Sequence, residues 1–271
     1  MSWKFRHALV RPPSGTYALG LTSAGQGPPD LTQAHAQHGA YCDALRGCGL
    51  EVRTLAPDER FPDATFVEDT AVLAERTAII TRPGAPSRLG EIRSIEAALV
   101  ELGADMQRIA APGSVDGGDI CQAEEHFFIG LSARTNEQGA HQLAGILRAH
   151  GYSASTIDIR NNRSLLHLKS GIAYLGERRL ALCSNFPDVP EFAGFQVIRS
   201  IADEDYAANC VRINQHVLIA SGYPQFAAQL ARAGLATLAL DMSEFRKMDG
   251  GLSCLSLRYD SLPAAPQGAR R

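Results

Sequence analysis

The sequence predicts an α/β fold in which five ββαβ units close into a ring. Short strand-like runs alternate with helical patterns of moderate length, and a strand–turn–strand pattern opens at Asp69, Asp119, Lys169 and Asn209. The intervals between these residues are 50, 50 and 40 residues. Repeats of this period are typical of arrays that stack or close on themselves. The alternative is an ordinary mixed α/β sheet with coincidental spacing.

The strand-like runs are rich in Val, Ile and Phe and are bounded by Gly, Pro, Asn or Asp, which favours short strands. They lie at 7–10, 52–55, 70–73, 77–81, 127–130, 172–175, 179–183, 195–198, 210–213, 216–219, 236–240 and 254–257. The runs 254–257 and 7–10 would form a fifth unit together. Five units in 271 residues give about 54 residues each.

The helical patterns lie at about 31–45, 87–102, 135–147 and 224–233. The clearest begins at Thr135, where Thr-Asn-Glu-Gln is typical of a capping box. Its apolar stripe at 140, 143, 144 and 147 has helical spacing. Three of the four marked hairpins are followed by a helix and a further strand. After Cys183 the helix is absent or very short.

Length and composition indicate one large globular domain. Of the 271 residues, 45% are hydrophobic and 20% are charged, close to the average of soluble domains. A chain of this length builds a full core without disulfides or metal. We therefore expect a single domain over 1–262. The tail 263–271 has almost nothing to bury, and we expect it to be disordered.

Charge and cysteine usage exclude several classes of protein. The 26 basic and 29 acidic residues give a net charge of −3, with no basic excess for a phosphate backbone or an anionic lipid surface. No apolar run approaches the roughly 20 residues of a membrane span, and no secretory segment is present. The six cysteines include no Cys-x-x-Cys pair, which disfavours a disulfide framework or a zinc site. We expect a cytoplasmic protein with no nucleic-acid partner, no membrane association and no metal.

Two acidic clusters adjoin apolar runs, where closed α/β folds tend to place their sites. The first contains Asp63, Glu68 and Asp69, and the second, Val-Asp-Gly-Gly-Asp-Ile, contains Asp116 and Asp119. Surface acids and an ordinary hairpin turn are the plain structural alternatives. Glu68 and Asp69 adjoin in a strand-like run, so their side chains should point to opposite faces. One of them must then face the interior, where a carboxylate needs a cationic partner or ligand.

Two further clusters carry a histidine and a cysteine. His167 lies in Leu-Leu-His-Leu-Lys-Ser, which reads as an apolar strand, and Cys254 follows the flexible turn of Met-Asp-Gly-Gly-Leu-Ser-Cys. Each alone is more typical of a core residue. Together with an acid they could form a nucleophile, an acid/base and its orienting group. A low thiol pKa or a neighbouring cationic substrate would supply the thiolate.

The motifs resemble those of a known family. Phe-Val-Glu-Asp-Thr, Asp-Gly-Gly-Asp, Gly-Leu-Ser-Ala-Arg-Thr-Asn, Leu-His-Leu-Lys-Ser, Ala-Ala-Asn-Cys and Met-Asp-Gly-Gly-Leu-Ser-Cys are similar to motifs of the dimethylarginine dimethylaminohydrolases, which belong to the guanidino-modifying (pentein) superfamily. The resemblance covers about residues 5–260, in order. It implies a five-bladed α/β propeller with pseudo-fivefold symmetry, in line with the repeat count.

The resemblance also implies catalytic roles. Cys254 would be the nucleophile, and His167 would protonate the leaving amine and then deprotonate the hydrolytic water. Asp116 stands where the family carries an acid that hydrogen-bonds the histidine. Asp69 would hold the substrate guanidinium, with Glu68 supporting the site.

The remaining implied roles concern the amino-acid end of the substrate. Arg88 and Arg134 match the arginines that bind the α-carboxylate, with Arg82 a competitor for the place of Arg88. Asp63, with the backbone carbonyls of Leu21 and Met248, would hold the α-ammonium.

The implied activity is hydrolysis of mono- and dimethylarginine to L-citrulline and methylamine or dimethylamine, through a cysteine-bound amidino intermediate. No metal or organic cofactor is needed for these steps. The alternatives are an arginine deiminase or another guanidino hydrolase on the same fold, a non-catalytic propeller that binds a partner and, more distantly, a metal hydrolase. The sequence leaves a homodimer open.

Overall fold

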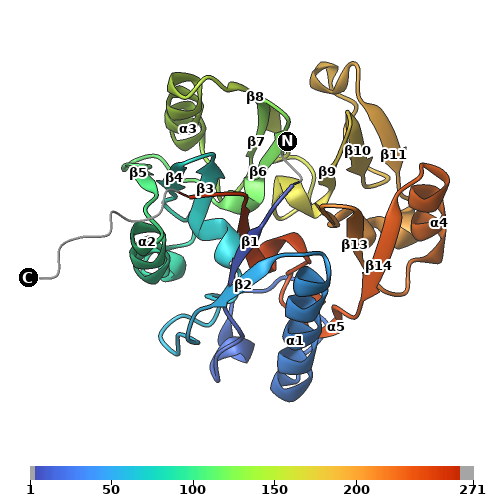
Figure 1. Cartoon of the computed structure of the whole chain (residues 1–271), viewed down its shortest axis with the longest axis horizontal. Coiled ribbons are helices and arrows are strands. Elements are labelled where there is room, and N and C mark those ends of the chain that lie inside the picture. Colours follow the sequence, from blue (N-terminus) through green and yellow to red (C-terminus); the bar gives the residue numbers. More distant parts are fainter. Residues whose placement is uncertain (1–3, 263–271) are drawn as a thin grey trace, which may run out of the picture.

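The computed structural model describes residues 4–262 of the chain. Five three-stranded sheets stand around a common axis, with helices at the periphery (Figure 1). This confirms the α/β fold and the ring of five units, the blades of a propeller. The predicted tail 263–271 lies outside the described residues.

Each sheet is one blade. In chain order, the first four blades are β3 (Ala71–Ala74), β4 (Thr77–Ile80) and β5 (Asp105–Arg108); β6 (Ile120–Ala123), β7 (His126–Leu131) and β8 (Ser153–Asp158); β9 (Ile172–Gly176), β10 (Arg179–Leu182) and β11 (Gln196–Arg199); β12 (Val211–Ile213), β13 (His216–Ala220) and β14 (Ala236–Leu240). The fifth blade combines β15 (Ser256–Tyr259), β1 (His7–Val10) and β2 (Glu51–Thr54).

Every blade has the same pairing. The middle strand is antiparallel to the inner strand and parallel to the outer strand. In the fifth blade His7 of β1 lies opposite Tyr259 of β15, so the predicted sharing of one blade between distant segments is confirmed. Residues from all five inner strands line a cavity at the axis of the ring.

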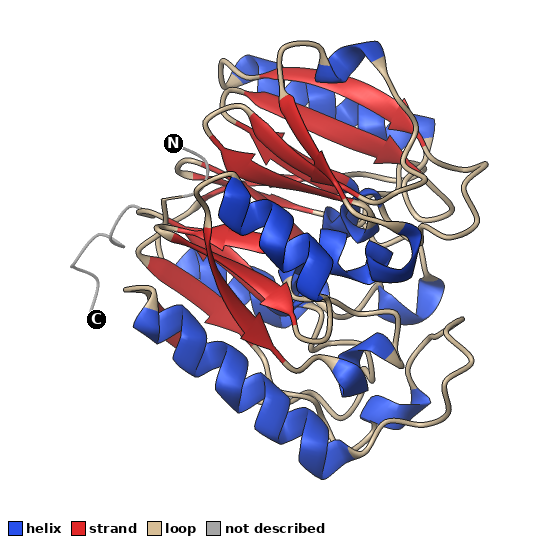
Figure 2. Cartoon of the chain, turned by 90° about the vertical axis from the view of Figure 1, so that its right-hand side faces the viewer, coloured by secondary structure: helices blue, strands red, loops and turns tan. Residues whose placement is uncertain are grey.

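Helices connect middle to outer strands in four blades and lie on the outside of the ring (Figures 1 and 2). They are α1 (Leu31–Gly47), α2 (Ile92–Glu101), α3 (Glu137–Ala149) and α4 (Pro224–Arg232). In the third blade a single 3₁₀ turn, η6 (Pro190–Phe192), takes the place of the helix, as predicted. A short helix α5 (Ser243–Arg246) precedes β15. Within residues 4–262, no helix combines the length and apolar character needed to cross a bilayer.

The hydrophobic core is divided into five clusters, each joining neighbouring blades. One of them packs Val72 and Ile79 of the first blade against Phe127 of the second, under Leu143 of α3. Burial of apolar side chains at each junction, at roughly 25 cal/mol per Å², therefore holds the blades side by side.

A short 3₁₀ helix precedes the inner strand of every blade. These turns are η2 (Val67–Thr70), η4 (Gly117–Asp119), η5 (Leu168–Ser170), η7 (Ala202–Ala208) and η8 (Ser253–Leu255). Three others in the described residues, η1 (Tyr17–Leu19), η3 (Pro86–Arg88) and η6, lie elsewhere. The predictions that His167 lies inside a strand and that a strand starts at Cys254 were therefore wrong: His167 caps η5, and Cys254 lies in η8. Short apolar runs fit strands and turns equally well, so periodicity did not separate them.

The predicted capping box at Thr135 was also wrong. Asn136 caps α3, and its side-chain oxygen accepts the N–H of Gly139 at 2.8 Å. The Thr135 hydroxyl instead donates to Asp119 at 2.7 Å.

Candidate active site

A pocket forms where the turns η2, η4, η5 and η8 pack together at the same end of the inner strands. Eight of the ten site residues predicted from the sequence line it: Leu21, Asp63, Asp69, Arg88, Arg134, His167, Met248 and Cys254. The other two do not line the pocket. Asp116 contacts the imidazole of His167, and Glu68 lines the axial cavity.

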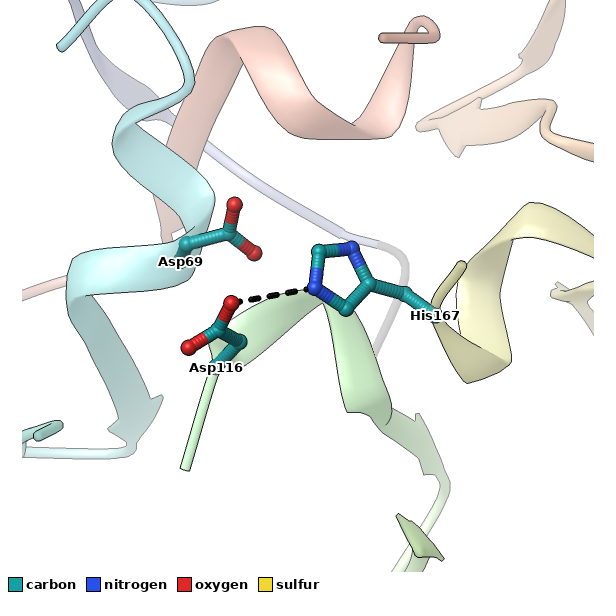
Figure 3. A group of neighbouring side chains, drawn as sticks. All are labelled: Asp69, Asp116 and His167. Carbon is teal, nitrogen blue, oxygen red and sulfur yellow. Dashed lines mark hydrogen bonds and ion pairs between the residues drawn. The ribbon is translucent and has the colours of Figure 1, made fainter. Parts of the chain in front are cut away.

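His167 and Asp116 form a buried pair. The imidazole Nε2 lies 3.1 Å from Asp116 Oδ2 (Figure 3), and Asp116 Oδ1 accepts the Gly84 N–H at 2.8 Å. Burial alone would lower the pKa of His167, but the carboxylates of Asp69, Asp119 and Asp116 outweigh it and raise the pKa to about 9. The imidazole is thus oriented and protonated at neutral pH, as a proton donor requires.

The two glycines between Asp116 and Asp119 permit this close arrangement. A Cβ on Gly117 would lie 2.0 Å from the Glu68 carbonyl oxygen. A Cβ on Gly118 would lie 2.7 Å from His167 Nδ1 and 2.8 Å from Asp69 Oδ1. These distances are too short for a side chain without displacement of the neighbouring atoms. The two glycines therefore allow Glu68, Asp69 and His167 to pack closely against this turn.

Cys254 is the one partly exposed thiol among the six, and it borders the pocket. Burial of its sulfur, together with the carboxylates of Glu68 and Asp69, raises its pKa to about 12. At neutral pH the unliganded site therefore holds a thiol, and a thiolate requires additional positive charge beside the sulfur.

Asp69 is held by two donors. Its Oδ1 accepts the Gly118 N–H at 2.8 Å, and its Oδ2 pairs with Arg88 Nη1 at 2.6 Å. Burial opposes the charge of Asp69, but His167 and Arg88 prevail and lower its pKa to about 2. A permanent carboxylate thus faces the pocket beside the cysteine.

Arg88 is buried and extensively bonded. Its Nε and Nη2 donate to Glu91, and Nη2 also reaches the carbonyls of Asp63 and Phe66. Glu91 was not singled out from the sequence, although its position three residues after Arg88 could have suggested a local ion pair. Burial raises the pKa of Glu91 to about 7 against the opposing effect of Arg88.

Glu68 and Asp69 line different cavities, as predicted, but they lie on the 3₁₀ helix η2 and the prediction that they lie on a strand was wrong. Its Oε1 accepts from Lys169 Nζ at 2.6 Å and from Arg258 Nη2 at 3.0 Å. The expected cationic partner of the buried carboxylate is therefore supplied by the protein, and both cations line the same axial cavity as Glu68.

An acid and a base, Asp63 and Arg134, also line the pocket. Asp63 is buried, which raises its pKa, and its Oδ1 accepts the Leu21 N–H at 3.0 Å. Arg134 lines the same pocket, and within residues 4–262 its guanidinium makes no hydrogen bond or ion pair. Arg82, the competitor for the role of Arg88, bonds the Gly113 carbonyl and does not line this pocket.

Asp69, Asp116 and His167 also offer one ligand atom each within 4.8 Å of one another, as a metal site would (Figure 3). In this structure Asp116 bonds His167 and Asp69 pairs with Arg88. These three side chains are therefore already satisfied by protein partners.

Comparison with known proteins places the chain in a family. No protein-family model matches it. The dimethylarginine dimethylaminohydrolase of Pseudomonas aeruginosa is 45% identical over 256 residues, which cover 94% of this chain and 100% of that protein. The chain belongs to the dimethylarginine dimethylaminohydrolase family. The Streptomyces coelicolor member is 33% identical, over 95% of this chain and 98% of its own.

Solved structures agree with this family membership. A cysteine-to-serine variant of the Pseudomonas aeruginosa dimethylarginine dimethylaminohydrolase, in complex with citrulline, superimposes with a TM-score of 0.90 at 44% identity, covering 94% of this chain and 100% of that one. The N-terminal domain of the cyanobacterial arginine dihydrolase ArgZ matches with a TM-score of 0.85 at 18% identity, covering 94% and 98%. That second likeness shows the shared fold alone.

Proposed function

We propose that this chain hydrolyses Nω-methylated arginines to L-citrulline and dimethylamine or methylamine. The observation that carries the proposal is the pocket itself: one cavity is lined by Cys254, His167, Asp69, Asp63 and Arg134, and the Arg134 guanidinium has no bonding partner within residues 4–262. The names of the relatives and the citrulline-bound structure support it.

A methylated arginine carries a guanidinium, an α-ammonium and an α-carboxylate. The pocket offers Asp69 to the guanidinium, Asp63 to the ammonium and Arg134 to the carboxylate, which a planar guanidinium can bind with two hydrogen bonds. Arg88 would contribute to the carboxylate only by exchanging some of its present partners, because Asp69, Glu91 and two carbonyls occupy most of its N–H groups. We assign the Leu21 and Met248 backbone a supporting role at the ammonium.

The chemistry follows from the charges of the site. The substrate cation between Asp69 and the sulfur would lower the pKa of Cys254, so the thiol would lose its proton to solvent water, and the thiolate would attack the guanidinium carbon. His167 would donate its proton to the departing amine as the carbon–nitrogen bond breaks, leaving an amidino group on the sulfur. The neutral imidazole would then take a proton from water, the hydroxide would attack the same carbon, and the carbon–sulfur bond would break to release citrulline.

The test is citrulline formation from asymmetric dimethylarginine and from arginine, side by side, with a metal chelator present. We expect turnover of the methylated substrate alone, and loss of that turnover in Cys254→Ser with an unchanged melting temperature. Faster turnover of arginine would favour the deiminase alternative. Absence of turnover with both substrates, or full activity of Cys254→Ser, would contradict the proposal.

We further propose that residues 1–262 act as one catalytic unit. The absence of nucleic-acid and membrane partners, the homodimer and the cytoplasmic location stay predictions.

A further inference from the structure

Asp119 is a fully buried carboxylate that does not line the pocket. Its Oδ2 accepts the hydroxyls of Ser132 and Thr135, both at 2.7 Å, and its Oδ1 accepts the Leu168 N–H at 2.9 Å. Within residues 4–262 it forms no ion pair with Lys or Arg. Burying a carboxylate costs free energy unless hydrogen bonds and a nearby positive charge offset that cost.

Each of the three donors belongs to a segment that carries a site residue. Leu168 directly follows His167. The Thr135 hydroxyl accepts the Asp116 N–H at 3.1 Å, and the Ser132 hydroxyl accepts the Arg134 N–H at 2.9 Å. One carboxylate thus connects the histidine, the acid that orients it and the unpaired arginine, which come from three separate parts of the chain.

The charge of Asp119 also interacts with the charge of His167. The carboxylates that act on His167 are Asp69 from η2, Asp119 from η4 and Asp116, which caps η4. Cys254 from η8, Arg88 and Arg134 line the same pocket. Burial raises the pKa of Asp119 to about 6, opposed chiefly by His167. The protonated imidazole is therefore the cation that this carboxylate stabilises.

We propose that Asp119 is the positioning residue of this site: it fixes His167, Asp116 and Arg134 relative to one another and supports the positive charge of the imidazole. This inference rests on the proposed function, because it assigns Asp119 a part in the same reaction. It also explains the Ser and Thr of Gly-Leu-Ser-Ala-Arg-Thr-Asn, whose hydroxyls are the two donors.

Asp119→Asn tests the proposal, and Asp205→Asn is its matched control. Asp205 accepts the N–H and hydroxyl of Ser184 and the hydroxyl of Ser200, the same set of donors, but it does not line the pocket or bond a segment that carries a site residue. We expect Asp119→Asn to lower kcat about 10²-fold, since small displacements of catalytic groups have effects of that size. Its pH–rate profile should lose activity at lower pH than the wild type. Asp205→Asn should change stability without moving the profile.

Two milder variants test the hydrogen bonds of Ser132 and Thr135 separately, and they remain informative if Asp119→Asn does not fold. Ser132→Ala frees the backbone of Arg134, and we expect a rise in KM of about 3–10-fold, the value of one hydrogen bond, with kcat nearly unchanged. Thr135→Val frees Asp116, and we expect it to lower kcat with little change in KM. Equal effects of both variants on KM and kcat would overturn the proposal.

NMR titration of His167 in the unliganded protein provides a readout that does not depend on turnover. We expect a lower pKa for the imidazole in Asp119→Asn and an unchanged value in Asp205→Asn. Equal titration in wild type and Asp119→Asn would overturn the inference even if the enzyme is active. An inactive wild type with a shifted titration in Asp119→Asn would instead overturn the proposed function and keep the positioning role.

Discussion

The turns η4 and η7 occupy equivalent places in the ring but differ in what they support. In η4, Asp119 accepts two hydroxyls and one N–H from segments that carry Arg134 and His167, and one of these hydroxyls accepts the N–H of Asp116. In η7, Asp205 accepts two hydroxyls and one N–H from Ser184 and Ser200, which carry no pocket residue. Hydrogen bonding is nearly the same in both. The difference teaches that function depends on which segments a buried acid connects.

The same turn η7 shows a purely structural use of a second acid. Glu204 is buried, and its carboxylate accepts the N–H groups of Gln225 and Phe226 at 3.1 and 2.6 Å, at the start of α4. This satisfies donors that every helix N-terminus leaves free. The two turns therefore predict opposite mutational signatures, one in activity and one in stability.

The largest loss is expected from Asp116→Asn, at the residue that caps η4. Without the carboxylate the imidazole loses both its orientation and part of its positive charge, and we expect kcat to fall about 10²–10⁴-fold. Steady-state kinetics with asymmetric dimethylarginine measure this. A loss below tenfold would show that Asp116 is not the partner that orients the histidine.

Gly118→Ala should have the next largest effect. Its Cβ would lie 2.7 Å from His167 Nδ1, so the ring must move, and we expect about a 10²-fold loss of kcat/KM. The matched control is Gly145→Ala on α3, where a Cβ meets nothing within 4 Å. Activity should be unchanged there and stability slightly increased. Equal activity of the two variants would contradict the close packing of histidine and turn.

The pH dependence should follow from His167 and Cys254. The pKa of His167 is raised to about 9, so the stability that its protonation adds is complete below about pH 6.5 and is lost as pH rises through 9. Turnover that needs the protonated imidazole should decline over the same range. Asp116→Asn should move the decline to lower pH, and an unmoved profile would show that another group sets it.

Thiol labelling sharpens the same point. Because the pKa of Cys254 is raised to about 12, the neutral reagent iodoacetamide should label it slowly at pH 7. The cationic reagent chloroacetamidine, which places positive charge beside Asp69, should label it at least about tenfold faster. Cys254→Ser gives the background of the buried thiols. Equal rates for both reagents would show that a cation does not activate the sulfur.

The smallest effect on activity is expected from Glu204→Gln in η7. Loss of the charged cap at α4 should lower the free energy of unfolding by about 1 kcal/mol. Urea unfolding and citrulline formation measured on one preparation test this. A loss of activity with unchanged stability would remove the contrast between the two turns.

The repeat spacing predicted the ring, and the motifs that resemble the family predicted most of the pocket. They did not predict that His167 and Cys254 lie on turns, since four apolar residues fit a strand or a turn equally well. They also missed Glu91, and they gave Asp119 no role, because its partners lie 13, 16 and 49 residues away and only the folded ring brings them together. Thr135 shows the reverse error. Its local sequence predicted that it caps the helix α3, but its hydroxyl bonds the distant carboxylate of Asp119.

The shared fifth blade has a consequence for biogenesis. Cys254 lies in η8, the turn that leads into β15, and β15 pairs with β1. Cys254 lies 185 residues after Asp69 along the chain. During synthesis from the N-terminus, the acids and the histidine emerge well before the sulfur, and domains begin to organise as they emerge. Nascent chains should therefore have no activity until the last inner strand, β15, pairs with β1. For the same reason, recovery of citrulline formation after dilution from denaturant should report closure of the ring.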